Sequence, residues 1–314
     1  MTAIIPAHNA EGTIDATLAS VRAQTHRELE IIVVDDGSTD GTRQRVRSHA
    51  AADSRIRLVA QANGGVAAAR NRGIAEASAH YLAPVDADDV WHPDKIARQL
   101  ALIENSSEVG LVCTAYSVLD EQGRVTMESG GSSPRNHQFL DLCERNFIGN
   151  GSSALLRRSA IEGCGGYDES LRRQGAQGCE DLKLYLCIAE HHRIEMIRSP
   201  LTGYRQLPDN MSSDAGQMLR SFDLVAAEFC RRRPELRARF AAHRTYLICW
   251  LAHRALKAQR WRQTLELSTQ LFTRPSRALP QAFAAAAGRR VKRLPLTFKR
   301  ARAAPAETFL EAEL

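Results

Sequence analysis

The chain has 314 residues, of which 44% are hydrophobic and 25% are charged, a composition typical of a globular protein with a buried core. Its formal net charge is +6, but residues 288–302 hold seven basic residues and no acidic one, so subtracting seven leaves −1 for the rest. The positive charge therefore belongs to one C-terminal segment, which excludes a nucleic-acid-binding domain. That segment is suited either to an anionic membrane surface or to a solvated tail.

Seven cysteines are spread along the chain without a CxxC pair, and their odd number leaves at least one unpaired in any disulfide scheme. Unpaired thiols are typical of a reducing compartment. No basic and apolar leader opens the sequence, and the apolar stretch near 247–251 is too short to span a bilayer. We therefore expect a cytoplasmic protein, with peripheral attachment to the cytoplasmic face of the inner membrane if the basic segment binds lipid.

The first part of the chain alternates short apolar runs with segments of helical periodicity. Four of the runs predict buried strands: 3–5, 31–34, 57–59 and 81–85. Alternation of this kind predicts an α/β domain with a mostly parallel central sheet and helices on both faces. In such sheets, ligands bind at the carboxyl ends of the strands.

Two turn segments follow the early strands. Residues 35–42 form either a simple turn with a helix cap or a site where the Asp36 carboxylate accepts a hydrogen bond from a nucleobase. Residues 63–73 begin with Gly64 and contain Arg70. Glycine lets the backbone approach a ligand and arginine matches phosphate, although an alanine-rich helix after a glycine turn is common.

Three carboxylates are clustered where the fourth apolar run ends: Asp86, Asp88 and Asp89. Oxygen ligands of this kind select Mg²⁺ or Mn²⁺, and one or two carboxylates suffice when substrate phosphates and water complete the coordination. The competing interpretation is that the acids cap the next helix. Capping explains one such residue but not three, so the cluster indicates a metal site.

The pattern changes from about Val109, where longer strands and a hairpin around 121–123 are expected. Glu180 and Asp181 then begin a predicted helix, and the helix macrodipole by itself explains acids at that position. After Ser213 the sequence predicts helices alone. We therefore predict three parts of the chain: a catalytic domain at 1–213, a helical C-terminal region at 214–287 and a basic tail at 288–314.

The order of four segments resembles glycosyltransferase family 2: Ile-Ile-Pro-Ala-His-Asn at 4–9, Val-Val-Asp-Asp-Gly-Ser-Thr-Asp at 33–40, Gly-Gly through Ala-Arg-Asn at 64–71, and Asp-Ala-Asp-Asp at 86–89. The resemblance covers roughly residues 2–210. It implies a GT-A fold and an inverting transfer of a sugar from a nucleotide diphosphate donor to a hydroxyl acceptor.

The resemblance also implies roles for individual residues. Two acids at the later helix start would act on the acceptor, with Asp181 as the base and Glu180 second to it. Asp88, together with Asp86, would hold the Mg²⁺ or Mn²⁺ ion. The nucleotide would contact residues from four segments: Pro6, Ala7, His8, Asn9, Asp36, Gly64, Arg70, Asp86 and Ala87. A segment with Arg205 would close over the phosphates, unless that arginine is simply a surface residue.

The implied donor is a nucleotide sugar, most simply a UDP-sugar, and the implied acceptor is a glycan or a lipid-linked molecule in bacterial polysaccharide or glycoconjugate synthesis. Two other functions compete with this one. A sugar-nucleotide nucleotidyltransferase needs a loop rich in glycine and arginine after the first strand, where this chain has 6–10 (Pro-Ala-His-Asn-Ala). A catalytically silent nucleotide-binding protein would share the fold without the chemistry.

Overall fold

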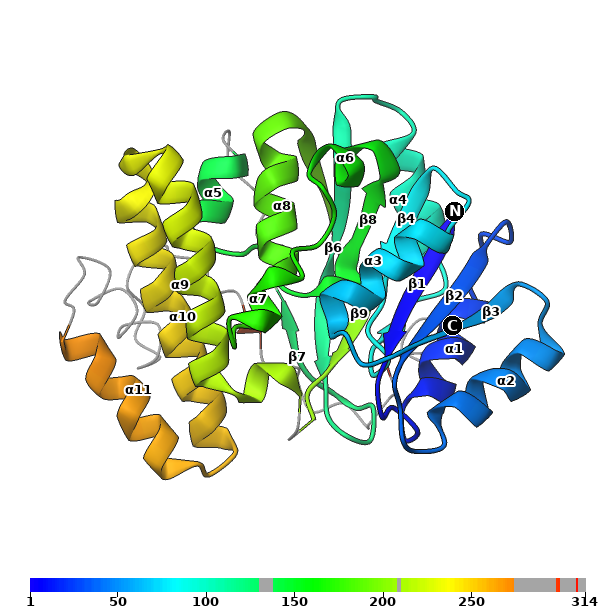
Figure 1. Ribbon diagram of the computed structural model, residues 1–314, viewed down its shortest axis with the longest axis horizontal. Helices are drawn as coiled ribbons and strands as arrows, with labels where there is room; N and C mark the ends of the chain where they lie inside the picture. Colours follow the sequence, from blue (N-terminus) through cyan, green and yellow to red (C-terminus); the bar gives the residue numbers. More distant parts are fainter. Residues whose placement is uncertain (130–137, 208–209, 274–297, 300–308, 310–314) are drawn as a thin grey trace.

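The computed structural model describes residues 1–129, 138–207, 210–273, 298–299 and 309 (Figure 1). A single sheet of ten strands crosses the molecule in the order β10-β7-β6-β8-β4-β1-β2-β3, and β9 pairs with both β5 and β6. Helices α9, α10 and α11 lie at one end of the molecule, and β1 to β3 lie at the other (Figure 1).

The N-terminal half of the sheet is parallel, as the alternating pattern predicted. Its strands are β1 (Thr2–Ala7), β2 (Glu30–Asp36), β3 (Ile56–Gln61) and β4 (Tyr81–Pro84). The connecting helices are α1 (Ile14–Arg22), α2 (Thr42–Ala52) and α3 (Val66–Glu76). Helix α3 packs closely on β1 because Gly73 has no side chain, and a methyl group there would overlap with Ile4. The predicted α/β class with a mostly parallel central sheet is confirmed.

The second half of the sheet is mixed. Its strands are β5 (Val90–Trp91), β6 (Val109–Leu119), β7 (Val125–Ser129), β8 (Ala154–Arg157) and β9 (Arg193–Arg205). Strand β8 runs antiparallel to both β4 and β6, whereas β6 and β9 are parallel. Strands β6 and β7 form the hairpin that was predicted around 121–123. The helices of this half are α4 (Lys95–Ile103), α5 (Gln138–Glu144), α6 (Arg158–Gly163), α7 (Ser170–Arg173) and α8 (Glu180–His191).

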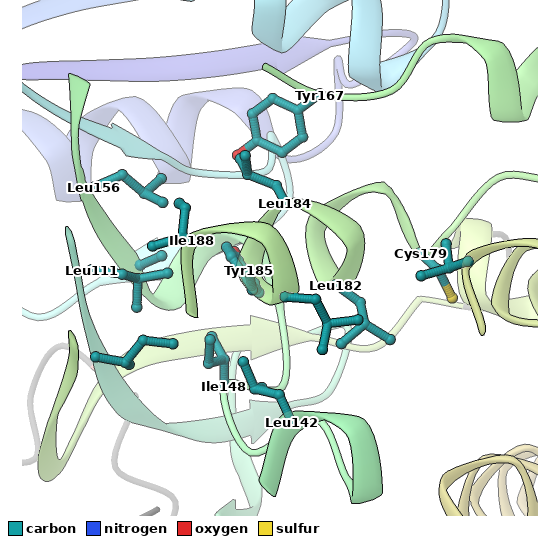
Figure 2. Close-up of a cluster of buried hydrophobic side chains, with 14 of the residues drawn as sticks. Leu111, Leu142, Ile148, Leu156, Tyr167, Cys179, Leu182, Leu184, Tyr185 and Ile188 are labelled. Atoms are coloured by element: carbon teal, nitrogen blue, oxygen red, sulfur yellow. The ribbon is translucent and has the colours of Figure 1, made fainter. Parts of the chain in front are cut away.

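Apolar side chains of α8 form the centre of the largest core cluster (Figure 2). Leu184 and Ile188, four residues apart on α8, are buried with Leu111 of β6 and Leu156 of β8. Burial of a leucine or isoleucine side chain contributes about 1.5–3 kcal/mol. This packing fixes the direction of α8 and therefore the position of the acids at its first turn.

The C-terminal helices are α9 (Ala215–Arg232), α10 (Arg237–Lys257) and α11 (Trp261–Thr273). Phe222 and Phe229 of α9 and Phe240 of α10 belong to the same apolar cluster as the buried side chains of α8. Helices α9 and α10 therefore share a core with the sheet. No helix in the described part of the chain is long and apolar enough to cross a membrane.

The predicted basic tail at 288–314 lies outside the described residues, apart from two short pieces. Strand β10 (Phe298–Lys299) pairs antiparallel with β7. Phe309 is buried against Val90 and Leu119. Residues 274–287 of the predicted helical region also lie outside the described residues.

Candidate active site

A cleft of about 650 Å³ opens at the carboxyl ends of β1 and β4. Pro6 at the end of β1 and His8 and Asn9 directly after it belong to its lining, and the segment after β4 contributes Asp86 and Asp88. Parallel strands place their carboxyl ends at the same sheet edge, which is why residues far apart in sequence meet here. The opposite side of the cleft is formed by the start of α8 and by residues of α9 and α10.

The Asp-Ala-Asp-Asp segment is held in place by the 3₁₀ turn η1 (Gly151–Ser153). Ser152 Oγ accepts a hydrogen bond from the main-chain nitrogen of Asp86 (3.0 Å) and donates to Asp89 Oδ2 (2.5 Å). The other oxygen of Asp89 accepts from the main-chain nitrogen of Arg205 (2.9 Å). Asp89 is fully buried with both carboxylate oxygens bonded, so it supports the segment and leaves Asp86 and Asp88 to face the cleft.

Asp88 lies in the cleft next to a second carboxylate. Burial and the nearby charge of Asp86 raise the pKa of Asp88 to about 7. Two neighbouring carboxylates suit a divalent cation, which takes oxygen ligands. In the described part of the chain, no three His, Cys, Asp or Glu side chains form a cluster able to hold a metal on their own. A cation at Asp86 and Asp88 would therefore share its coordination with substrate oxygens and water.

Arg205 is not a surface residue, and that alternative is wrong. It is 8% exposed, and its guanidinium donates to the main-chain oxygens of Asp88 (2.9 Å) and Glu121 (3.2 Å). Because the guanidinium is hydrogen-bonded to two carbonyl groups, it helps to fix the backbone of the Asp-Ala-Asp-Asp segment. Its positive charge also lowers the pKa of Asp88, against the larger effect of burial.

Arg70 connects the two sides of the cleft. Its Nη2 lies 2.6 Å from Asp86 Oδ1, and its Nη1 lies 3.0 Å from Glu180 Oε1. The guanidinium also stacks over the ring of Tyr167, 5.2 Å from the ring centroid. Arg70 is 3% exposed. Because arginine is planar and always charged, this one side chain holds both acids in a fixed relative position.

The two acids at the start of α8 differ in their surroundings. Glu180 is buried, pairs with Arg70 and accepts a hydrogen bond from the main-chain nitrogen of Gly178 (2.9 Å). Asp181 is half-buried and lines the cleft, and burial together with the charge of Glu180 raises its pKa to about 7. A carboxylate with a pKa near neutrality in a cleft can accept a proton from a substrate hydroxyl.

Neither Asp36 nor Gly64 belongs to the lining of the cleft. The Asp36 carboxylate accepts hydrogen bonds from Gln61 Nε2 (2.8 Å) and from the main-chain nitrogens of Gly64 (2.7 Å) and Gly65 (2.8 Å). His8 Nδ1 donates to the main-chain oxygen of Asp36 (2.9 Å). Asp36 therefore fixes the glycine turn that begins α3. Because Arg70 lies on α3, this turn also helps to fix the position of Arg70.

The structure brings nine of the predicted residues to the cleft: Pro6, His8, Asn9, Arg70, Asp86, Ala87, Asp88, Glu180 and Asp181. Ala7 is buried in β1 outside the lining, as Asp36 and Gly64 are outside it. Sequence reasoning missed the contribution of the C-terminal helices, of which α10 supplies His243, Tyr246 and Trp250. Their spacing of three and four residues marks one helix face, which was the available signal.

Comparison with known proteins identifies relatives of this chain. The sequence model described as "Glycosyl transferase family 2" matches residues 2–165. The putative teichuronic acid biosynthesis glycosyltransferase TuaG of Bacillus subtilis is 34% identical over 150 residues, which cover 48% of this chain and 59% of TuaG. A UDP-Glc:α-D-GlcNAc-diphosphoundecaprenol β-1,3-glucosyltransferase of Escherichia coli, WfgD, is 40% identical over 101 residues, covering 32% of this chain and 39% of WfgD. The chain thus spans less than two thirds of these relatives.

Two solved structures share the fold of this chain. Residues 1–349 of S. aureus TarS in complex with UDP align with 16% identity and a TM-score of 0.54, covering 99% of this chain and 98% of that one. The mannosyltransferase PcManGT of Pyrobaculum calidifontis, in complex with GDP-Man and Mn²⁺, aligns with 20% identity and a TM-score of 0.57, covering 91% of this chain and 79% of that one. At these identities the likeness establishes the fold.

The role of Arg70 predicts a specific loss of stability. In Arg70→Met, Glu180 would be left buried without its counter-charge, so the free energy of unfolding should fall by about 3–5 kcal/mol in urea titration. The matched control is Arg72→Met, which removes an exposed arginine of the same helix from its pair with Glu76 and should change little. Equal stability of Arg70→Met and wild type would contradict the bridging role.

Proposed function

The chain belongs to glycosyltransferase family 2, and from that membership we propose that it moves a sugar from a nucleotide diphosphate-sugar to a hydroxyl acceptor, with inversion at the anomeric carbon. The observation that carries the proposal is a single cleft in which Arg70 ties Asp86 on one side to Glu180, the neighbour of Asp181, on the other. Family membership sets aside the nucleotidyltransferase alternative.

We assign the nucleotide diphosphate to the β1 and β4 side of the cleft. Its predicted contacts remain those proposed from the sequence: Pro6, Ala7, His8, Asn9, Asp36, Gly64, Arg70, Asp86 and Ala87. Asp36 and Gly64, which lie outside the lining, would act through the turn that they form. A UDP-sugar is the proposed donor, because WfgD is named for UDP-Glc and TarS was solved with UDP and with UDP-GlcNAc.

We propose that Asp88, with Asp86, holds Mg²⁺ or Mn²⁺. The donor set fits, because both residues offer carboxylate oxygens and the fixed positive charge of Arg70 is already shared between two acids. When bound, such an ion neutralises the negative charge that develops on the departing diphosphate. PcManGT, a similar fold, was solved with Mn²⁺.

Asp181 is the proposed catalytic base. The acceptor oxygen forms a bond to the anomeric carbon while the bond from that carbon to the diphosphate oxygen breaks, and Asp181 takes the hydroxyl proton. Direct displacement inverts the anomeric centre and needs one positioned base without a covalent intermediate. Glu180, held by Arg70 and by the main chain of Gly178, is second to Asp181 and keeps the first turn of α8 in place.

The biological setting is proposed from the same relatives. TuaG is named for teichuronic acid biosynthesis and WfgD for a lipid diphosphate acceptor, which supports bacterial polysaccharide or glycoconjugate synthesis. All seven cysteines are free thiols, in keeping with the proposed cytoplasmic location. Peripheral contact with an anionic membrane is proposed for the basic segment at 288–302, most of which lies outside the described residues.

The metal assignment predicts how nucleotide binding depends on the cation. UDP should raise the melting temperature of the protein when Mg²⁺ or Mn²⁺ is present and should have much less effect in chelator, because Asp86 and Asp88 repel a bare diphosphate. Asp88→Asn should abolish the metal-dependent shift in a thermal-shift assay. Asp94→Asn, an acid outside the cleft, is the control and should keep it. Equal stabilisation by UDP in chelator and in metal would refute the assignment.

The base assignment predicts a pH profile. Asp181 is active when deprotonated, and its pKa is raised to about 7, so kcat/KM for the acceptor should fall about tenfold per pH unit below that value and level off above it. Asp181→Asn should abolish transfer and leave donor affinity, measured by calorimetry, nearly unchanged. Glu180→Gln should be milder. Loss of donor affinity in Asp181→Asn would move this residue to the donor site or to a structural role.

A further inference from the structure

Part of the cleft is built by helices that lie outside the segment matched by the family model, 2–165. Met218 of α9 and Tyr246, Leu247 and Trp250 of α10 line the cleft together with Asp181. Tyr246, Leu247 and Trp250 are half-buried and lie within two helical turns on one face of α10. These side chains therefore form a wall of the site that the family resemblance does not account for.

Helix α10 is fixed to the catalytic domain by His243. The Nε2 atom of His243 accepts a hydrogen bond from the main-chain nitrogen of Asn146 (3.1 Å), and His243 is 3% exposed. The Asn146 side chain then accepts from the main-chain nitrogens of Ile148 and Gly149 (both 3.1 Å). This loop leads directly into Gly151, which packs against the guanidinium of Arg70. The position of the α10 wall is thus tied to the acids of the cleft.

The side chains around this part of the cleft are amphipathic. Tyr246 and Trp250 offer aromatic rings, and Tyr116 and Tyr204 form an edge-to-face pair elsewhere in the lining, with ring centroids 6.1 Å apart. Amide side chains line the same cleft: Asn146, Asn150, Gln206 and Asn210. A sugar ring has an apolar C–H face and a rim of hydroxyl groups, so aromatic faces and amide groups match it in type.

The charge of the lining argues against an anionic group at this position. Among the described residues that line the cleft, Arg70 carries the one fixed positive charge, and it is shared between Asp86 and Glu180. Arg145 lies near Tyr246 but outside the lining. A phosphate or carboxylate placed beside Asp181 would be desolvated next to a like charge, which is costly.

We propose that α9 and α10 complete an acceptor subsite that binds a neutral sugar ring, with Tyr246 and Trp250 as its specificity-determining residues. The inference rests on the proposed transferase function, because it places the acceptor next to Asp181. It assigns the part of the cleft lined by α9 and α10 to an uncharged saccharide, whatever larger molecule carries that saccharide.

Saturation-transfer NMR tests the subsite directly, with methyl β-glucoside and methyl β-N-acetylglucosaminide as neutral probes and methyl β-glucuronide as the charged one. With UDP and Mg²⁺ present, the ring protons of a neutral probe should receive saturation and those of the glucuronide should not. Trp250→Ala and Tyr246→Ala should each raise the Kd of the neutral probe about tenfold, and Trp250→Phe should restore most of the affinity. Trp261→Ala, which removes an exposed tryptophan of α11, is the matched control and should bind as wild type does.

Binding of UDP with Mg²⁺, measured on the same samples, distinguishes failure of the subsite proposal from failure of the transferase proposal. It also shows that each variant is folded. Failure of both neutral probes to bind while UDP binds would overturn the subsite and leave the transferase proposal standing. Preference for the glucuronide, or unchanged affinity in both Trp250→Ala and Tyr246→Ala, would overturn it as well. Absence of UDP binding in wild type would count against the transferase proposal itself.

Discussion

The buried guanidinium of Arg70 is the interaction on which the rest of the cleft depends. It joins Asp86, at the end of a parallel strand, to Glu180, at the start of a helix that lies 110 residues after Arg70 in the chain. Each acid alone would be repelled by the other negative charges in the cleft. Held by one planar cation, Asp86 and Glu180 keep a fixed relative position in one cleft, and the proposed transfer from a nucleotide sugar to an acceptor depends on fixed positions of this kind.

Rigid packing beneath the acidic segment supports this arrangement. Trp91 is fully buried, and its Nε1 donates to the main-chain oxygen of Ser152 (2.9 Å). Lys95 Nζ lies 4.1 Å from the Trp91 ring centroid and donates to Gln99 (2.9 Å), and burial lowers the pKa of this lysine well below its usual value. Neither side chain of this pair lines the cleft. Trp91 bonds to the turn η1, whose Ser152 bonds to Asp86 and Asp89. Packing outside the cleft therefore fixes the positions of these two acids.

Much of the fold, and the cleft residues at the ends of β1 and β4, could be predicted, because buried parallel strands leave continuous apolar runs and their carboxyl ends collect the polar residues. The place of Asp36 outside the lining could not be predicted, because the sequence does not reveal that its carboxylate accepts hydrogen bonds from Gln61 and from two glycine main-chain nitrogens. The sequence also does not show that Arg205 is buried, because its hydrogen bond to the main chain of Asp88 depends on where β9 lies in the sheet. The face of α10 reads as ordinary core, since packing and ligand contact share the same apolar periodicity.

Anomalous diffraction from crystals grown with UDP and MnCl₂ tests the central claim most directly, because it locates the cation relative to both acids and the diphosphate. The account predicts a manganese peak about 2.0–2.3 Å from a carboxylate oxygen of Asp88, with phosphate oxygens of UDP in the same coordination sphere and Asp181 facing them across the cleft. UDP bound in the cleft without manganese at Asp86 or Asp88, or manganese bound elsewhere on the protein, would contradict it.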